Sequence, residues 1–213
     1  MRSQFVKDFY YSSVGKLTYF SCLWAGLRSS KYSGKFVNIG CGPDYVEGMI
    51  NVDGNLFRRK EIWLDVNFGL PFASGSIAGV YSSHTVEHFD VDHCRKLLSE
   101  CCRVLKPGCK TRIVVPSLEF AIGAYSENRP GDLPDWPEKY RSIGGRFSNF
   151  LLVANQHFLL LDFTFLEELL LDAGFGEVVR SSARVSDHFN QDHMQFEFKG
   201  EPDTSLYVEA KKL

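Results

Sequence analysis

Apolar and polar positions follow two different periods along the chain. Residues 91–105 and 163–173 repeat apolar positions every three or four residues, which predicts amphipathic helices. Short apolar runs instead predict buried strands, at residues 36–39, 49–53, 61–64, 77–82, 112–115, 178–180 and 205–210, with a further strand expected at 194–199. Because strands alternate with helices or crossovers, the pattern predicts an α/β protein with a mainly parallel sheet that ends in an antiparallel hairpin.

Two stretches fall outside this alternation. Residues 4–28 mix aromatic and charged residues at helical spacing and predict one or two amphipathic helices, within an N-terminal helical segment 1–34. Residues 117–160 form a long insertion with several prolines. Long ordered insertions in compact domains tend to be functional, so we expect this one to shape a substrate site. No run of about 18 apolar residues occurs, and we expect no membrane span.

Composition narrows the class of protein. The 213 residues fit a single domain, 1–213, and 44% hydrophobic residues suffice for a sizeable core. The net charge of −2 offers no basic excess for a nucleic-acid backbone, so nucleic acid is not an expected partner. The six cysteines form no C-x-x-C pair and predict reduced thiols in a cytoplasmic protein.

A glycine turn follows the first predicted strand directly. Gly40-Cys41-Gly42-Pro43 comes at the carboxyl end of residues 36–39, where parallel sheets bind their ligands and where a side chain would hinder close approach. A dinucleotide fingerprint requires a third glycine, but that position holds Tyr45. Asp53 also lies closer to the glycines than the usual ~20 residues. The turn therefore disfavours NAD while leaving a nucleoside ligand open.

Two acids end neighbouring strands at the same edge of the sheet. Asp53 follows the second strand and could accept hydrogen bonds from ribose hydroxyls, and Asp65 follows the third and could accept one from an adenine amine. The alternative is that each acid caps a loop or a helix. Combined with the glycine turn, the pair favours a nucleoside ligand.

Seven motifs in order resemble those of class I S-adenosylmethionine (SAM)-dependent methyltransferases, in the small methyltransferase-11-like group. They span about residues 35–180 and are Val37–Pro43, Asn51–Asp53, Leu64-Asp65, Leu70–Phe72, Val80–His88, Leu105–Gly108 and Ala173–Phe175. The resemblance implies a Rossmann-like three-layer α/β/α sandwich with a mainly parallel seven-stranded sheet and an antiparallel C-terminal strand. It also implies a short first crossover with little room for a helix.

The same resemblance implies SAM as cofactor and S-adenosylhomocysteine as product. Gly40 and Gly42 would line the methionine end, Asp53 would hold the ribose, Asp65 would lie near the adenine, and the segment 1–34 would form a lid over the cleft. The full set of cofactor-binding residues implied is Asn38, Gly40, Cys41, Gly42, Asp53, Gly54, Asp65, Val66, Ser83 and His84. Asn38 stands where many relatives carry an acid.

Four residues are candidates for a general base: His84, Glu87, His88 and His157. The alternative for His157 is a loop histidine bonded to backbone. His84-Thr85-Val86-Glu87-His88 also matches the zinc-protease pattern H-x-x-E-H. However, His84 directly follows a strand, so the two histidines straddle a turn and no third ligand is evident.

Other polar clusters have ordinary explanations. Asp187-His188 and Asp192-His193 could ligate a metal but are typical of polar loops, and we expect no metal. Lys139, Arg141 and Arg146 could meet an anionic acceptor, but interleaved acids favour a solvated helix face.

The function expected is methyl transfer to a small-molecule or glycan-type acceptor. The alternative is a non-catalytic SAM- or nucleoside-binding domain with a regulatory or interaction role. A transferase using the aminopropyl or nucleoside part of a related cofactor is a third option, but it usually needs more carboxylates than Asp162 and Glu167. The sequence does not predict an oligomeric state.

Overall fold

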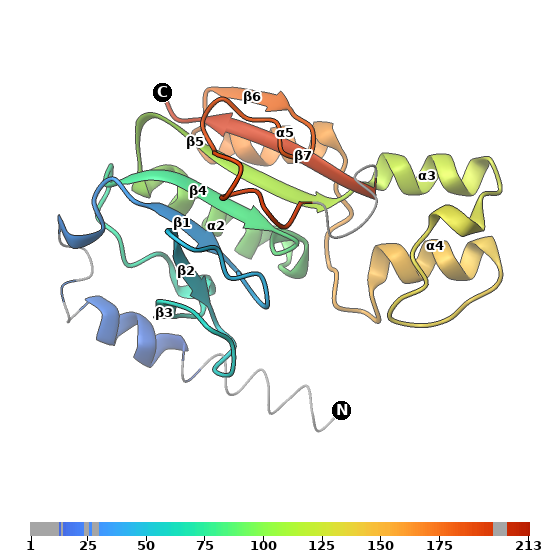
Figure 1. The fold of residues 1–213 in the computed structure, drawn as a ribbon, viewed down its shortest axis with the longest axis horizontal. Helices are drawn as coiled ribbons and strands as arrows, with labels where there is room; N and C mark the ends of the chain where they lie inside the picture. Colours follow the sequence, from blue (N-terminus) through green and yellow to red (C-terminus); the bar gives the residue numbers. More distant parts are fainter. Residues whose placement is uncertain (1–12, 14, 24–25, 27–29, 198–203) are drawn as a thin grey trace.

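A computed structural model describes residues 13, 15–23, 26, 30–197 and 204–213, and places them around one seven-stranded sheet (Figure 1). The strands are β1 (Phe36–Ile39), β2 (Ile50–Asp53), β3 (Ile62–Trp63), β4 (Ile77–Ser83), β5 (Leu105–Pro116), β6 (Glu177–Arg180) and β7 (Ser205–Lys211). The helices are α2 (Val91–Val104), α3 (Leu118–Ser126), α4 (Ile143–Leu152) and α5 (Phe163–Asp172), with short 3-10 turns η1 (Ser30–Tyr32), η2 (Val66–Phe68), η3 (Val86–His88) and η4 (Pro130–Asp132).

The strand order is β3-β2-β1-β4-β5-β7-β6. β7 runs antiparallel to both β5 and β6, while β1 to β5 pair in parallel. The mainly parallel sheet with an antiparallel C-terminal strand is therefore confirmed. The final hairpin has an additional feature, because β7 inserts between β5 and β6 and leaves β6 at the edge.

The main core lies between the sheet and the pair α2 and α5. Both helices present an apolar face: α2 buries Leu97, Leu98 and Cys101, and α5 buries Leu166 and Leu169. Side-chain oxygens cap both helix starts, since Asp90 accepts from the N–H of His93 and Asp162 from that of Phe165. Apolar periodicity and caps together explain why both helices form where the sequence predicted them.

The opposite face of the sheet carries a smaller apolar cluster. Alternate strand residues Tyr81, Val114 and Tyr207 pack there against Phe189 and Met194, which belong to the irregular segment before β7. The strand expected at 194–199 is wrong for its first part, because residues 194–197 form turns, while residues 198–199 lie outside the described residues. The segment thus covers this face of the sheet with its side chains and does not add a strand to the edge of the sheet.

A buried ion network ties this segment to the sheet. Arg112 of β5 is fully buried, and its guanidinium donates to Glu197 at 2.7 Å and to Glu209 of β7 at 2.9 Å. It also donates to the carbonyls of Ser182 and Val185. One side chain therefore fixes β5, β7 and the two ends of the irregular segment.

The connection between β1 and β2 contains no helix. Residues 40–49 pass from one strand to its parallel neighbour through turns alone, as the short crossover predicted. Asn51 replaces the missing helix as an anchor: its side-chain oxygen accepts from the N–H of Val46, and its amide donates to the carbonyls of Val46 and Met49. The glycine turn is thus held by buried side chains of the sheet.

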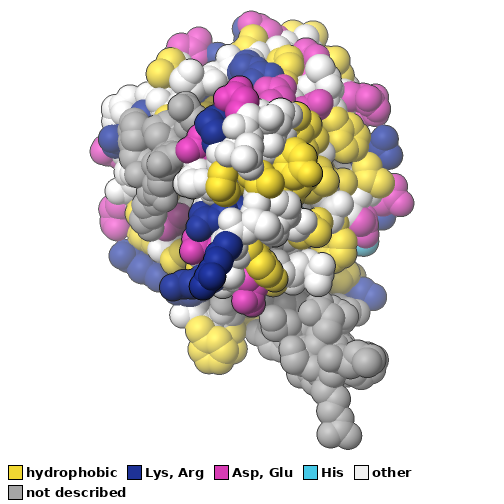
Figure 2. All heavy atoms as spheres, turned by 90° about the vertical axis from the view of Figure 1, so that its right-hand side faces the viewer, with side chains coloured by type: hydrophobic (Ala, Val, Ile, Leu, Met, Phe, Trp, Pro, Cys, Tyr) yellow, Lys and Arg dark blue, Asp and Glu magenta, His cyan; other side chains and the backbone are white. Residues whose placement is uncertain are grey.

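Helices α3 and α4 extend from the sheet at the carboxyl end of β5 and pack on each other (Figure 1). Their small core contains Ala121, Ala124, Leu133, Phe150 and Leu151. Apolar side chains are also visible on the outside of this end of the molecule (Figure 2). None of the helices in the described residues is long and apolar enough to cross a membrane.

Candidate active site

The glycine turn has the backbone conformation that only glycine adopts readily. Gly40 has φ +65° and Gly42 has φ +49°. A Cβ on Gly40 would lie 2.4 Å from the Cγ2 of Thr85, whereas a Cβ on Gly42 would have no atom nearer than 4.0 Å. Gly40 is therefore required by packing, and Gly42 leaves open space where a ligand can approach the backbone.

Asp53 is joined directly to this turn. Its Oδ2 accepts from the N–H of Gly42 at 2.8 Å, and its Oδ1 accepts from the N–H of Asn55 at 2.6 Å. Each carboxylate oxygen has a second lone pair and can still accept from a hydroxyl. The acid and the open glycine meet at the carboxyl edge of β1 and β2, an arrangement that fits a ribose-bearing ligand.

Asp65 lies beneath the N-terminal helical residues 15–23. It is 9% exposed, caps η2 by accepting from the N–H of Asn67, and has its Cβ 2.7 Å from the position of a Cβ on Gly15. Burial raises the pKa of the Asp65 carboxyl above its ordinary value. The capping alternative for this acid is therefore realised. Its role beside an adenine stays a prediction, as does the lid, of which residues 1–12, 14, 24–25 and 27–29 lie outside the described residues.

Four other residues of the expected cofactor set are buried or hydrogen-bonded within the protein. Asn38 is buried, and its amide donates to Asn51 at 3.0 Å and to the carbonyl of Asp44 at 3.0 Å. Cys41 is buried, and its burial raises the pKa of the thiol to about 12. Val66 is also buried, and the Gly54 carbonyl accepts from Trp63. These residues are thus held by contacts within the protein, and their contact with a cofactor stays a prediction.

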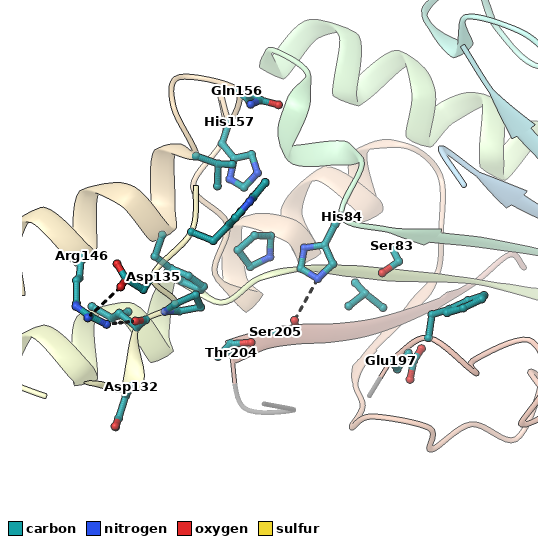
Figure 3. Close-up of a pocket in the computed structure, with 18 of the residues that line it drawn as sticks. Ser83, His84, Asp132, Asp135, Arg146, Gln156, His157, Glu197, Thr204 and Ser205 are labelled. Atoms are coloured by element: carbon teal, nitrogen blue, oxygen red, sulfur yellow. Dashed lines mark hydrogen bonds and ion pairs between the residues drawn. The ribbon is translucent and has the colours of Figure 1, made fainter. Parts of the chain in front are cut away.

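Ser83 and His84 lie where β4 ends and border a cavity of about 800 Å³ (Figure 3). The cavity extends from Asp44, just after the glycine turn, to the loop before α4. Apolar walls come from Leu133, Trp136 and Phe150. A volume of this size accommodates a small molecule or part of a larger one.

Part of the polar lining of the cavity comes from the 117–160 insertion. Asp132, Asp135 and Arg146 line one end, where Arg146 pairs with Asp135 at 3.6 Å and donates to the Leu133 carbonyl (Figure 3). The helix expected at Lys139 and Arg141 is wrong, because both lie in the loop before α4, although both are exposed to solvent as expected. Arg146 lies on α4 and donates to the carbonyl of Tyr140 in that loop. Arg146 instead organises the cavity wall.

The four base candidates meet around one buried carboxylate. The Oε1 of Glu87 lies 3.4 Å from the Nδ1 of His84 and 3.9 Å from the Nε2 of His157, and the rings of His88 and His157 are 4.7 Å apart. Glu87 is 1% exposed, whereas the three histidines border the cavity. Burial lowers the pKa of His157, and the neighbouring Glu87 opposes that shift without reversing it. A neutral imidazole facing the cavity can accept a proton from an acceptor.

A strained turn brings His157 to this cluster. Val153, Ala154 and Asn155 all have positive φ, and the chain then returns so that the N–H groups of Phe158 and Leu159 donate to the Glu87 carbonyl. His157 is seventy positions from Glu87 in the sequence, so no local pattern could join them. In the sequence, the only indication of this cluster is that Glu87 stands between two histidines, His84 and His88.

The two acid–histidine pairs near residue 190 form no comparable cluster. Asp187 pairs with Lys110, the Nε2 of His188 lies 2.6 Å from the Ala78 carbonyl, and His193 packs on the ring of Phe36. Their interpretation as polar loop residues agrees with these contacts.

Comparison with known proteins gives a match in sequence for the first half of the chain and a likeness in fold for nearly all of it. Residues 25–113, which contain the glycine turn, Asp53 and the η3 turn, match the family model described as a methyltransferase domain. No curated protein matches the sequence.

Solved structures extend the likeness of fold over nearly the whole chain. A SAM-dependent methyltransferase from Archaeoglobus fulgidus is 19% identical, with 96% of this chain and 98% of that chain covered and a TM-score of 0.53. One from Thermotoga maritima is 17% identical, with 99% and 97% covered and a TM-score of 0.53. Phosphoethanolamine N-methyltransferase 2 of Haemonchus contortus, solved with SAM, is 15% identical, with 96% and 59% covered and a TM-score of 0.51. Residues 25–113 therefore form a methyltransferase domain, in a chain whose sheet has the fold of the class I SAM-dependent methyltransferases.

Proposed function

We propose that this methyltransferase binds SAM at the glycine turn and transfers its methyl group to a small-molecule or glycan-type acceptor held in the cavity beside Ser83 and His84. The sulfur–methyl bond of SAM breaks as the bond from methyl to acceptor forms, and S-adenosylhomocysteine leaves. The acceptor proton passes to a nearby base, for which His157 and His84 are our candidates. The sulfonium is already activated, so alignment and exclusion of water are the main tasks of the protein.

The observation that carries this proposal is the position of the cavity. Its lining begins with Asp44, Ser83 and His84 at the cofactor edge of the sheet and continues into the 117–160 insertion. An acceptor in this space would lie next to the methyl group of a cofactor seated on Gly42 and Asp53. The insertion supplies both the apolar wall and the polar end, which supports its expected role on the acceptor side.

The test measures S-adenosylhomocysteine release with two acceptor panels, small hydroxyl- and amine-bearing compounds and oligosaccharides. Trp136→Ala removes an exposed cavity side chain, and Tyr125→Ala removes a half-exposed aromatic on α3 outside the cavity. We expect Trp136→Ala to raise the KM for the acceptor about tenfold or more, as loss of a large apolar contact predicts. The Kd for SAM should not change, and Tyr125→Ala should behave like the parent protein.

Binding of SAM without turnover of any acceptor in either panel would contradict the proposal and favour the non-catalytic cofactor-binding domain. Equal KM values for both variants would place the acceptor outside this cavity. We further propose a cytoplasmic location, which six unpaired cysteines support and fractionation of the producing cells would test.

A further inference from the structure

The carboxylate of Glu87 is buried without a hydrogen-bond donor. The side chain is 1% exposed, and among the described residues neither Oε1 nor Oε2 has a hydrogen-bond partner. A charged group taken from water without compensation is costly, and buried polar atoms in native proteins nearly always have a partner. Both carboxylate oxygens of Glu87 are therefore open to a hydrogen-bond donor or a cation.

Ligand atoms from two segments, η3 and the loop after α4, surround this point. One atom each from Glu87, His88 and His157 lies within 4.8 Å of the others, and no further group of three or more such side chains occurs in the part of the chain that the structure describes. His84 stands beside the group, with its Nδ1 3.4 Å from Glu87 and its side chain half-exposed toward the cavity. The arrangement concentrates nitrogen and oxygen donors around one buried carboxylate.

Backbone carbonyls fix the orientation of two of the rings. The Nδ1 of His88 lies 3.0 Å from the carbonyl of Gln156, and the Nδ1 of His157 lies 3.0 Å from that of Leu151. Because a carbonyl only accepts, each Nδ1 must carry a proton, which leaves Nε2 as the atom that each ring can offer to a metal ion. Metal-binding histidines show this same arrangement, in which the second ring nitrogen donates to a carbonyl or carboxylate.

We propose that Glu87, His88 and His157 bind one divalent transition-metal ion, with Zn²⁺ as the best-fitting species. Two imidazole nitrogens and one carboxylate oxygen suit Zn²⁺ or Fe²⁺, whereas Mg²⁺ and Ca²⁺ prefer oxygen ligands alone. The cation would supply the missing partner of the Glu87 carboxylate.

Three protein ligands leave at least one coordination position for water or substrate. Both histidines border the cavity, so that position would face the acceptor. An acceptor oxygen bound there would lose its proton more readily and be held for methyl transfer. This role rests on the proposed function, but binding of the metal does not.

In the sequence, the H-x-x-E-H pattern brings together only His84 and His88 as histidine ligands of zinc. The structure supplies the missing ligand from the loop after α4, and it places His84, whose backbone has φ +49°, at the margin of the group. A different use of the same side chains is a proton relay from His157 to Glu87, which requires no metal. Titration with metal separates the two.

The experiment uses the whole chain, freed of any affinity tag, stripped with EDTA and dialysed. Zn²⁺ is titrated by calorimetry, Co²⁺ by absorption, and Mg²⁺ serves as the comparison ion. We expect one Zn²⁺ per chain, and Co²⁺ bands typical of nitrogen and oxygen ligation. Glu87→Gln and His157→Gln should each weaken Zn²⁺ binding by about tenfold or more. His88→Gln, at a half-buried ligand, should do the same.

His93→Gln is the matched control, because His93 is exposed and pairs with Asp90 away from the cavity. It should bind Zn²⁺ like the parent protein. Circular dichroism and calorimetric SAM binding, recorded on each variant without acceptor, establish that the variant is folded. Folded parent protein that binds neither Zn²⁺ nor Co²⁺, unchanged binding in the ligand variants, or binding of Mg²⁺ alone would each overturn the proposal. Failure of methyl transfer with intact Zn²⁺ binding would instead contradict only the proposed function.

Discussion

The backbone N–H of Gly42 donates to the Oδ2 of Asp53 at 2.8 Å, so the glycine turn and the acid that follows β2 form one unit. A change in either residue therefore alters the shape of the turn as well as the groups offered to a ligand.

Asp53→Ala should weaken SAM binding by about 10- to 100-fold, because a hydrogen bond to a charged group contributes about 1.5–3 kcal/mol. Calorimetric titration with SAM and S-adenosylhomocysteine measures the loss. Glu47→Ala removes an exposed acid of the same crossover, which pairs with Arg59, and as the control it should bind as the parent does. An unchanged affinity of Asp53→Ala for SAM would show that Asp53 does not bind the ribose.

Gly40→Ala should destabilise the protein by about 2 kcal/mol or more, since it combines a positive φ with a contact at 2.4 Å. Denaturant unfolding gives the value. Thr85→Ala removes the two nearest atoms, so the double variant should recover part of the loss relative to the sum of the single changes. Gly144→Ala is the control: nothing lies within 4 Å of its Cβ, and in α4 it should be neutral or mildly stabilising.

Arg112→Met should cost about 3–5 kcal/mol of the free energy of unfolding, because it leaves Glu197 buried without its cation and Glu209 with Lys110 in place of two cations. Arg180→Met breaks an exposed pair with Glu119 and should cost about 1 kcal/mol or less. Chemical denaturation of both variants under the same conditions gives the comparison. Similar losses for the two would show that the buried network contributes no more than a surface pair.

Glu61 should contribute to stability in a pH-dependent way. Burial by itself would raise the pKa of this carboxyl, but hydrogen bonds from Tyr45 and from the backbone and side chain of Asn51 hold it below the ordinary value of 4.5. A lowered pKa in the folded state means that the stabilisation is complete above pH about 4.5 and is lost as the pH falls through the lower value.

Glu61→Gln should therefore lower the melting temperature at pH 7 and flatten its dependence on pH below about 5. Thermal unfolding from pH 3 to pH 7 provides the measurement, with Glu47→Gln as an exposed acid for comparison. A parallel shift of the whole curve, with an unchanged slope at acidic pH, would show that Glu61 acts through packing alone.

The sequence by itself determined the positions of the seven strands of the sheet, the two amphipathic helices and the glycine turn, because period, caps and positive φ are local properties. It also predicted a strand from residue 194, where the chain forms turns. It also indicated Asp53, which lies eleven positions from Gly42 on the adjacent strand. The burial of Asp65 beneath residues 15–23 and the use of Asn38 as an anchor required knowledge of which segments pack together.

Only the tertiary structure decided which polar residues far apart in the sequence come into contact. Arg112 meets Glu197 and Glu209 across a sheet face, and His157 reaches Glu87 through a turn of three residues with positive φ. Periodicity in a sequence records which side of an element is apolar, but not which distant polar group compensates a buried charge. That choice depends on the packing of the whole chain, and here it places the base candidates around one carboxylate at the cavity.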